Sequence, residues 1–202
     1  MKKLRRSVFV SGLVGIMSLG LLQIGLVPVV QARTEKTLIL EVAQDGRTFA
    51  LNQVTPGATD VARGDVGVIN GNIYPKGTIP PGFDGTFDLD AVPGIGTWRC
   101  LIAILAEPPL SGAVTYYFSL GETEEGSEKS MLIVQGLNSH QGPASVPRIL
   151  AIVGGTGEFS GATGEVREEV IGTNSTGATG FNLRYHFKIK KQAFQAIEKN
   201  KE

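Results

Sequence analysis

The feature that most constrains the fold is a series of alternating apolar and polar segments joined by short turns. The stretch from Phe181 to Lys190 alternates strictly, so its apolar residues share one face of a strand and its polar residues the other. Similar segments occur at residues 37–43, 65–71, 97–105, 113–120, 130–136, 147–154 and 164–172, with residues 47–54 as a weaker example. The pattern predicts eight or nine strands.

The links between most of these segments are short and rich in Gly, Pro, Asn and Ser, which favours antiparallel neighbours. A parallel crossover needs about a dozen residues or more, and only residues 75–96 offer that length. A sheet of many short strands removes its exposed edges by closing on itself. We therefore expect an all-β domain with a closed antiparallel sheet over residues 33–190. Residues 191–202 should form a polar tail or short C-terminal helix.

The N-terminus has the pattern of a secretory signal peptide. Four basic residues lie within the first six positions, and an apolar run extends from about Ser7 to Val30. Because Val30-Gln31-Ala32 resembles a cleavage site, we expect residues 1–32 to be removed and the body to be periplasmic or secreted. The run is also long enough to span a bilayer, so an uncleaved membrane anchor is the alternative.

The charge balance and the cysteine count exclude some classes of protein. The whole chain has 19 Lys plus Arg and 19 Asp plus Glu, so loss of the four basic leader residues makes the body net acidic. An acidic body argues against binding to nucleic acid or to an anionic membrane surface. We expect contact with a membrane only through the N-terminal leader. With Cys100 as the single cysteine, no intrachain disulfide can form.

The glycine-rich stretch at residues 151–166 looks at first like a dinucleotide-binding turn. Such a turn leads from a strand into a helix, whereas residues 164–172 have strand periodicity here. No Gly-Lys-Ser or Gly-Lys-Thr closes the run as in a phosphate-binding loop. We therefore expect no cofactor, and interpret Gly154, Gly155, Gly157 and Gly161 as residues that shape a tight turn.

The same stretch resembles a known family. The pattern from Ile152 to Ala162 is similar to the signature of dirigent proteins and allene oxide cyclases, with further matches at residues 64–66, 72–74, 116–121 and 134–136. The resemblance covers most of residues 38–190. It implies an eight-stranded antiparallel barrel with an apolar cavity, commonly assembled as a homotrimer.

The resemblance to the cyclases also implies candidate catalytic residues. It places Glu41 at the position of a pocket glutamate and Cys100 near a pocket cysteine. Ala43 replaces the expected asparagine, and the expected tyrosine after Gly136 is missing, so cyclase chemistry is only half supported. Glu41 on an exposed strand face and Cys100 as a small packed residue are the structural alternatives.

Candidate ligand-binding residues are aromatic. The long Pro- and Gly-rich segment at residues 74–96 is a candidate lid, or else a surface loop that pads one end of the barrel or forms a subunit contact. Aromatic residues within it, after it or in a later strand are the candidates for a ligand wall: Tyr74, Phe83, Phe87, Trp98 and Tyr116.

A metal site is not expected. The two histidines, His140 and His186, fall in a loop and on a polar strand face, which is not a zinc-binding arrangement. The aspartates at positions 84, 88 and 90 lack the spacing of a calcium loop.

Three functions remain open on the sequence alone. The first is a secreted dirigent-like barrel that binds a small hydrophobic or phenolic molecule and directs the stereochemistry of its reaction. The second is an isomerase of the allene oxide cyclase type, acting on an oxidised fatty acid and requiring an inward, desolvated Glu41. The third is a non-catalytic surface or assembly protein with a filled barrel.

Overall fold

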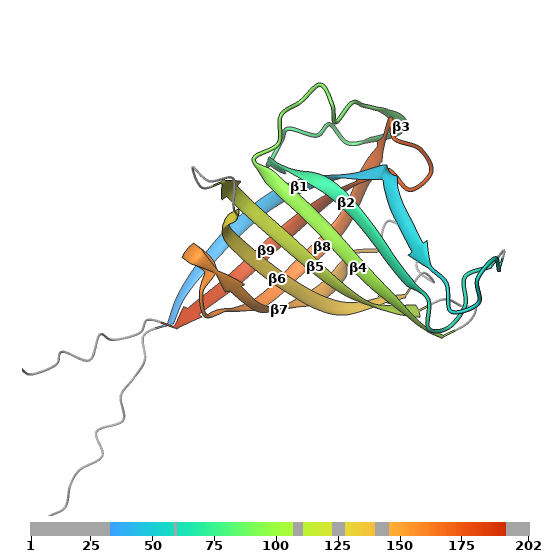
Figure 1. Cartoon of the computed structure of the whole chain (residues 1–202). Coiled ribbons are helices and arrows are strands. Elements are labelled where there is room, and N and C mark those ends of the chain that lie inside the picture. The colour runs from blue at the N-terminus through green and yellow to red at the C-terminus, as the bar shows by residue number, and fades with distance from the viewer. Residues whose placement is uncertain (1–32, 59, 107–110, 123–127, 140–145, 193–202) are drawn as a thin grey trace, which may run out of the picture. The chain divides into compact units, whose positions relative to one another are not determined.

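The computed structural model describes residues 33–58, 60–106, 111–122, 128–139 and 146–192 (Figure 1). The predicted signal peptide at residues 1–32 lies outside these ranges. Within them, no helix has the length and apolar character needed to cross a bilayer.

Nine strands make up the described part of the chain: β1 (Arg33–Asn52), β2 (Val66–Pro75), β3 (Gly82–Phe87), β4 (Gly96–Ala106), β5 (Ser111–Glu122), β6 (Glu128–Ser139), β7 (Arg148–Thr156), β8 (Ala162–Asn174) and β9 (Phe181–Gln192). The helical element in this part is a single 3-10 turn, Gly157–Phe159. The predicted C-terminal helix from residue 191 is not supported, because β9 continues pairing with β1 as far as Gln192, opposite Arg33. Residues 193–202 lie outside the described ranges.

Eight of the strands close into an antiparallel barrel, which confirms the predicted closed sheet. Their order is β8-β7-β6-β5-β4-β2-β1-β9, and pairing between β8 and β9 closes the ring. The ninth strand, β3, lies outside the barrel and pairs with β8 in parallel. It was not predicted, because its sequence GFDGTF has two glycines and an aspartate in place of an alternating apolar pattern.

The two predicted segments at residues 37–43 and 47–54 belong to one long strand, β1. The strand pairs with β2 on both sides of an irregularity between Asp45 and Ala50. Thr48 stabilises this bend, since its hydroxyl donates to the Asp45 carbonyl oxygen at 2.7 Å and accepts from the Asn70 N–H at 2.9 Å. A bulge of this kind bends a strand without ending it.

The barrel interior, or lumen, is lined by the inward face of each strand. In β9 this face includes Leu183, Tyr185, Phe187 and Ile189, all of which are buried. They belong to a single apolar cluster that receives residues from all eight barrel strands. Burial of alternate residues is what the sequence pattern predicts for a strand with one face on the core.

The segment between β2 and β4, residues 76–95, packs on the outside of the barrel wall, and we call it the outer segment. It occupies the top of Figure 1 and carries β3. A second, separate apolar cluster lies beneath it, made of Ala43, Tyr74, Ile79, Phe87, Leu89 and Ile171. We call this the outer cluster. Its members on β1, β2 and β8 point away from the lumen, because they alternate with residues that face it.

The glycine-rich stretch forms the connection from β7 to β8. Gly157 and Gly161 have φ values of 57° and 72°, a conformation that glycine adopts without steric cost. A Cβ on Gly155 would lie 2.7 Å from the Phe159 Cβ, whereas a Cβ on Gly154 would meet nothing within 4 Å. The chain therefore needs glycine at some positions of this turn and not at others.

Candidate functional site

A buried ion pair lies in the lumen between neighbouring strands. Glu168 of β8 and Arg148 of β7 are directly opposite each other in the ladder. An Arg148 Nη2–H donates a hydrogen bond to Glu168 Oε1. The Glu168 side chain is 1% exposed and that of Arg148 is 28% exposed, so Arg148 is the member of the pair that solvent reaches.

Aromatic side chains surround this pair. Tyr185, opposite Glu168 in the β8–β9 ladder, packs edge-on against Phe118 with ring centroids 4.9 Å apart. Tyr116 packs against both Tyr185 and Trp98, and its ring centroid lies 5.9 Å from that of Tyr185 and 5.3 Å from that of Trp98. These four rings are at most 3% exposed, and they form an aromatic wall from β4, β5 and β9.

Three polar atoms in this buried setting have no hydrogen bond of good geometry within the described part of the chain, although the Tyr116 and Tyr185 hydroxyls lie close enough to Glu168 to lower its pKa. They are Trp98 Nε1, the Tyr185 hydroxyl oxygen and Glu168 Oε2. An unpaired buried polar atom costs about 1–3 kcal/mol. Native proteins keep few of them, and each calls for a partner such as water or a ligand. The cluster is therefore suited to a molecule with both an acceptor and a donor.

Burial dominates the protonation of this cluster. It raises the pKa of Glu168, against the opposing effects of the Arg148 charge and the nearby Tyr116 and Tyr185 hydroxyls. Burial also raises the pKa of Cys100 to about 12, and the Glu168 carboxylate adds to this rise. The pKa values of Tyr116 and Tyr185 are raised well above 10 for the same reasons. At neutral pH the thiol and both phenols therefore keep their protons.

Glu41, the predicted catalytic glutamate, is buried but faces away from the lumen. It alternates with Leu40 and Val42, which are part of the interior cluster, and it pairs in register with Arg184 and Tyr74. Its Oε1 accepts hydrogen bonds from Arg184 Nε at 3.0 Å and Nη2 at 2.7 Å. Its Oε2 accepts from the backbone N–H of Ile79 at 2.8 Å.

This environment keeps Glu41 ionised. Burial by itself raises the Glu41 pKa, but the backbone N–H groups of Ile79 and Gly77 and the Arg184 guanidinium outweigh it, and the pKa is lowered. A carboxylate so paired anchors the outer segment to the barrel wall. It lacks the raised pKa and the access to the lumen that a pocket acid needs.

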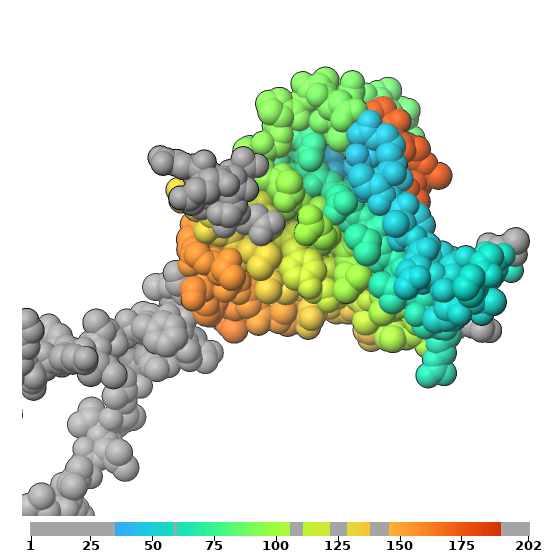
Figure 2. Space-filling view, viewed as in Figure 1, coloured from blue at the N-terminus to red at the C-terminus, as the bar shows by residue number. Residues whose placement is uncertain are grey.

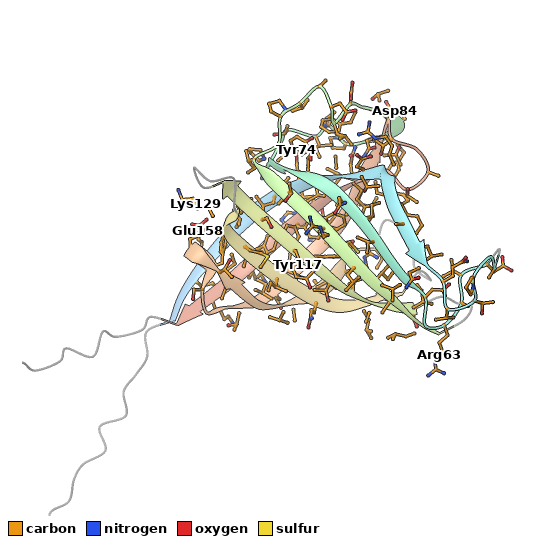
Figure 3. The ribbon with its side chains drawn as sticks, in the orientation of Figure 1. Arg63, Tyr74, Asp84, Tyr117, Lys129 and Glu158 are labelled. Atoms are coloured by element: carbon orange, nitrogen blue, oxygen red, sulfur yellow. The ribbon has the colours of Figure 1, made fainter. Side chains whose placement is uncertain are left out.

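The other predicted site residues divide between the two clusters. Cys100, Trp98 and Tyr116 line the lumen. Tyr74 and Phe87 pack against each other in the outer cluster, with ring centroids 5.6 Å apart, and Figure 3 shows Tyr74 beneath the outer segment. Phe83 is 65% exposed. The lumen and the outer cluster lie on opposite faces of the wall, so these residues do not form one site.

The described residues hold no group of three or more His, Cys, Asp or Glu side chains placed to bind a metal ion. His186 lies on the outer face, with Nε2 3.6 Å from Glu169 Oε2.

Glu168 and Arg148 were not predicted as site residues, although the sequence contains a signal for each. Glu168 alternates with Val166 and Val170, and Arg148 with Leu150 and Ile152, so each charged residue occupies an apolar-face position. A charge on the buried face of a strand is rare unless it is paired. Tyr185 was placed correctly on the apolar face of its strand but was not predicted as a site residue.

Comparison with known proteins places the fold. No family model matches the chain, and no curated protein matches it. The solved structure of the pterocarpan synthase dirigent protein GePTS1 has a TM-score of 0.58 and 15% identity, covering 81% of this chain and 93% of that one. A second pterocarpan synthase dirigent protein, PsPTS1, has a TM-score of 0.56 and 15% identity, covering 80% and 97%. The chain therefore has the dirigent-type barrel fold, and the resemblance seen in the glycine motif is confirmed at the level of fold.

Proposed function

We propose that this dirigent-type barrel binds a small, mainly apolar or phenolic molecule in its lumen and fixes its orientation. The observation that carries this proposal is the set of three unpaired buried polar atoms, on Trp98, Tyr185 and Glu168, within an aromatic wall. A small-molecule site typically combines a mostly apolar lining with a few polar groups that set orientation.

A phenolic head group fits this set of atoms. Its hydroxyl can donate to Glu168 Oε2 and accept from Trp98 Nε1–H or the Tyr185 hydroxyl. Its ring can pack edge-on against the aromatic wall, as the side chains already do with one another. Because the shared fold is that of proteins named as dirigent proteins, we further propose that the fixed orientation directs the stereochemistry of a reaction of the bound molecule.

The single tryptophan makes the proposal directly testable. Trp98 lies in the lumen, so its fluorescence reports on that space alone. The purified protein is titrated with 4-propylphenol, followed by Trp98 fluorescence and by calorimetry, and native mass spectrometry of the untreated protein shows any retained ligand. We expect saturable binding that changes the Trp98 emission.

Two tyrosine variants form a matched pair for this test. Tyr185→Phe removes an unpaired lumen hydroxyl and should weaken binding by about 0.5–1.5 kcal/mol. Tyr117→Phe alters an outward-facing residue on the wall nearest the viewer in Figure 3 and should leave affinity unchanged. Saturable binding without a change in Trp98 emission, or equal effects of the two variants, would place the ligand elsewhere.

An isomerase is the second candidate function, and the observation that favours it is the buried Glu168. A carboxyl group with a raised pKa inside an apolar pocket is suited to moving a proton on a bound molecule. We propose Glu168, in place of Glu41, as the acid or base of such a reaction. A ligand recovered from the protein after incubation in deuterated water should gain deuterium at carbon with the natural protein and not with Glu168→Gln.

We also propose that the barrel associates with copies of itself through its β4–β7 wall. This wall faces the viewer in Figure 2 and carries five exposed apolar side chains: Leu101, Leu105, Leu137, Ile149 and Val153. By contrast, the outer faces of β8 and β9 carry Glu165, Arg167 and Lys188. A large exposed apolar patch often marks an interaction surface. Analytical ultracentrifugation gives the number of subunits.

Export remains a proposal that rests on the N-terminal sequence. N-terminal sequencing of protein recovered outside the cytoplasm should begin after Ala32 if residues 1–32 are cleaved. A start at residue 1 would indicate the uncleaved anchor instead.

A further inference from the structure

The polar groups of the lumen are mostly hydrogen-bond donors. Arg148 and the Trp98 indole can only donate, and the protonated side chains of Tyr116, Tyr185 and Cys100 can each donate one hydrogen. Glu168 is the one carboxyl group of the lumen among the described residues. A site with many donors and one internal carboxyl group is complementary to a ligand that brings a carboxylate acceptor of its own.

The Glu168 carboxyl group already accepts a hydrogen bond from Arg148, the charged donor of the cluster. Glu168 Oε1 accepts from Arg148 Nη2, while Oε2 has no partner within the described residues. Arg148 is 28% exposed and Glu168 1%. An incoming carboxylate can therefore reach the guanidinium and compete with Glu168 for it, because arginine forms charge-assisted hydrogen bonds with carboxylates.

Glu168 is the group of this cluster whose charge can change on ligand binding, because burial already raises its pKa and it shares a guanidinium with the incoming anion. The titratable groups that act on it are Arg148 of β7, Tyr116 of β5, Tyr185 of β9 and Cys100 of β4. Burial holds both phenols and the thiol in their protonated forms, and an arginine does not lose its charge in a protein. Two carboxylates at one guanidinium repel each other, and the repulsion is relieved when one of them takes a proton.

We propose that the lumen binds a small aromatic carboxylate whose anionic head pairs with Arg148, displaces Glu168 from it, and is accompanied by uptake of one proton onto Glu168. The inference rests on the proposed function and deepens it, because it names the head group of the ligand. Charge balances in this exchange: the anion brings one negative charge, the proton from solvent neutralises Glu168, and Arg148 remains paired. The protonated Glu168 becomes a donor to the ligand.

Two probes with the same apolar tail and different head groups separate the contribution of the head group to affinity from that of the rest of the ligand. The purified protein is titrated with 4-propylbenzoate and with 4-propylphenol by calorimetry, in buffers of different ionisation enthalpy, from about pH 5 to about pH 8. The benzoate should bind on the order of tenfold more tightly than the phenol, because its hydrogen bonds are charge-assisted. It should take up as much as about one proton per molecule, and the phenol none.

The pH dependence of benzoate affinity has a definite sign. Below the pKa of Glu168 in the free protein, Glu168 is already protonated, so binding takes up no proton and affinity does not change with pH. Above that pKa, binding needs a proton from solvent, and benzoate affinity falls as pH rises, by at most about tenfold per pH unit. Phenol affinity should not follow this curve.

Variants of the ion pair test the roles directly. Glu168→Gln removes the internal competitor, so benzoate affinity should rise by about tenfold and proton uptake should vanish. Arg148→Gln should lower benzoate affinity by about tenfold or more and leave phenol affinity within about twofold. Arg148→Lys keeps the charge and should retain most of the benzoate binding. A merely structural pair would instead lose affinity for both probes in every variant.

The outcomes separate this inference from the proposed function. If the phenol binds and shifts Trp98 emission but the benzoate binds no more tightly or takes up no proton, the inference is wrong and the proposed function stands. If neither probe binds, both fail. Should Arg148→Gln not fold, the rise or fall of benzoate affinity in Glu168→Gln decides the question, since the inference requires a rise.

Discussion

Replacing Glu41 with glutamine should loosen the outer segment from the barrel and leave ligand binding in the lumen unchanged. Glu41 joins three parts of the chain: its own strand β1, Arg184 on β9 through two hydrogen bonds, and the outer segment through the Ile79 N–H. The side chain is fully buried, so water cannot replace these partners without local opening. The substitution keeps the size of the side chain and removes its charge.

The expected loss of unfolding free energy follows from the hydrogen bonds that are no longer made to an ionised group. A bond to an ionised group contributes about 1.5–3 kcal/mol, against about 0.5–1.5 kcal/mol for a neutral one. The amide oxygen can still accept from Ile79 or from Arg184, so Glu41→Gln should cost about 1–3 kcal/mol. Glu41→Ala leaves Arg184, whose side chain is 21% exposed, without its carboxylate, and should cost about 3–5 kcal/mol.

The destabilisation caused by Glu41→Gln should depend on pH, and the lowered pKa of Glu41 sets the direction of that dependence. Because the folded-state pKa lies below the ordinary value of 4.5, the ionised Glu41 stabilises the fold fully above that value. The contribution is lost as pH falls through the folded-state pKa. The difference in unfolding free energy between the natural protein and Glu41→Gln should therefore be constant near neutral pH and shrink in acid.

Urea unfolding at several pH values measures this difference, and hydrogen exchange at the Ile79 amide reports opening of the segment. Glu165→Gln is the matched control, since Glu165 pairs with Lys188 at 3.0 Å but both side chains are more than half exposed. Its cost should not exceed about 0.5 kcal/mol. The reasoning fails if Glu41→Gln costs no more than the control, if its cost is independent of pH, or if it weakens 4-propylphenol binding as Tyr185→Phe does.

Three further predictions concern the turn, the lumen wall and assembly. Gly157→Ala should destabilise the fold by about 1 kcal/mol or more in urea, because its φ is positive and a Cβ would overlap the Lys129 carbonyl oxygen, whereas Gly154→Ala has open space and should be near neutral. Phe118→Ala should cost about 3–5 kcal/mol in the same assay, since Phe118 is fully buried, and an effect below about 1 kcal/mol would contradict its place in the core. Leu137→Lys, at a side chain that is 68% exposed, should lower the subunit number in ultracentrifugation without loss of monomer stability, and an unchanged assembly would exclude this wall as the contact.

Much of the barrel could be predicted from local pattern. The alternation in Phe181–Lys190 identifies which side chains of β9 enter the core, and the structure buries Leu183, Tyr185, Phe187 and Ile189 as that pattern requires. The reason is geometric, since successive residues of a strand point to opposite faces. The same rule identifies Glu168 as inward-facing once Val166 and Val170 are seen on either side of it.

The candidate site was only partly predictable, because the sequence does not show what covers the outside of a strand. Glu41 is polar among apolar neighbours, which fits an exposed glutamate or a pocket acid equally well. Tyr74 and Phe87 lie in a Pro- and Gly-rich segment whose path is set by tertiary contacts, including the Tyr74 hydroxyl, which shares its one hydrogen between the carbonyl oxygens of Leu89 and Val92, each 3.3 Å away. A local pattern gives no information on such contacts.

The sequence alone determined the segments that form the eight barrel strands, the antiparallel pairing of neighbours, and which residues of a strand share a face, because these follow from two-residue periodicity and short links. Only the tertiary structure decided which side chains or spaces each face of a strand contacts. Closure of β8 onto β9 brought Arg148, Glu168 and Tyr185 into one enclosed space, and the fold of residues 76–95 onto the wall buried Glu41 on the opposite side. These contacts join residues up to 143 positions apart in the chain, and no local rule reaches that far.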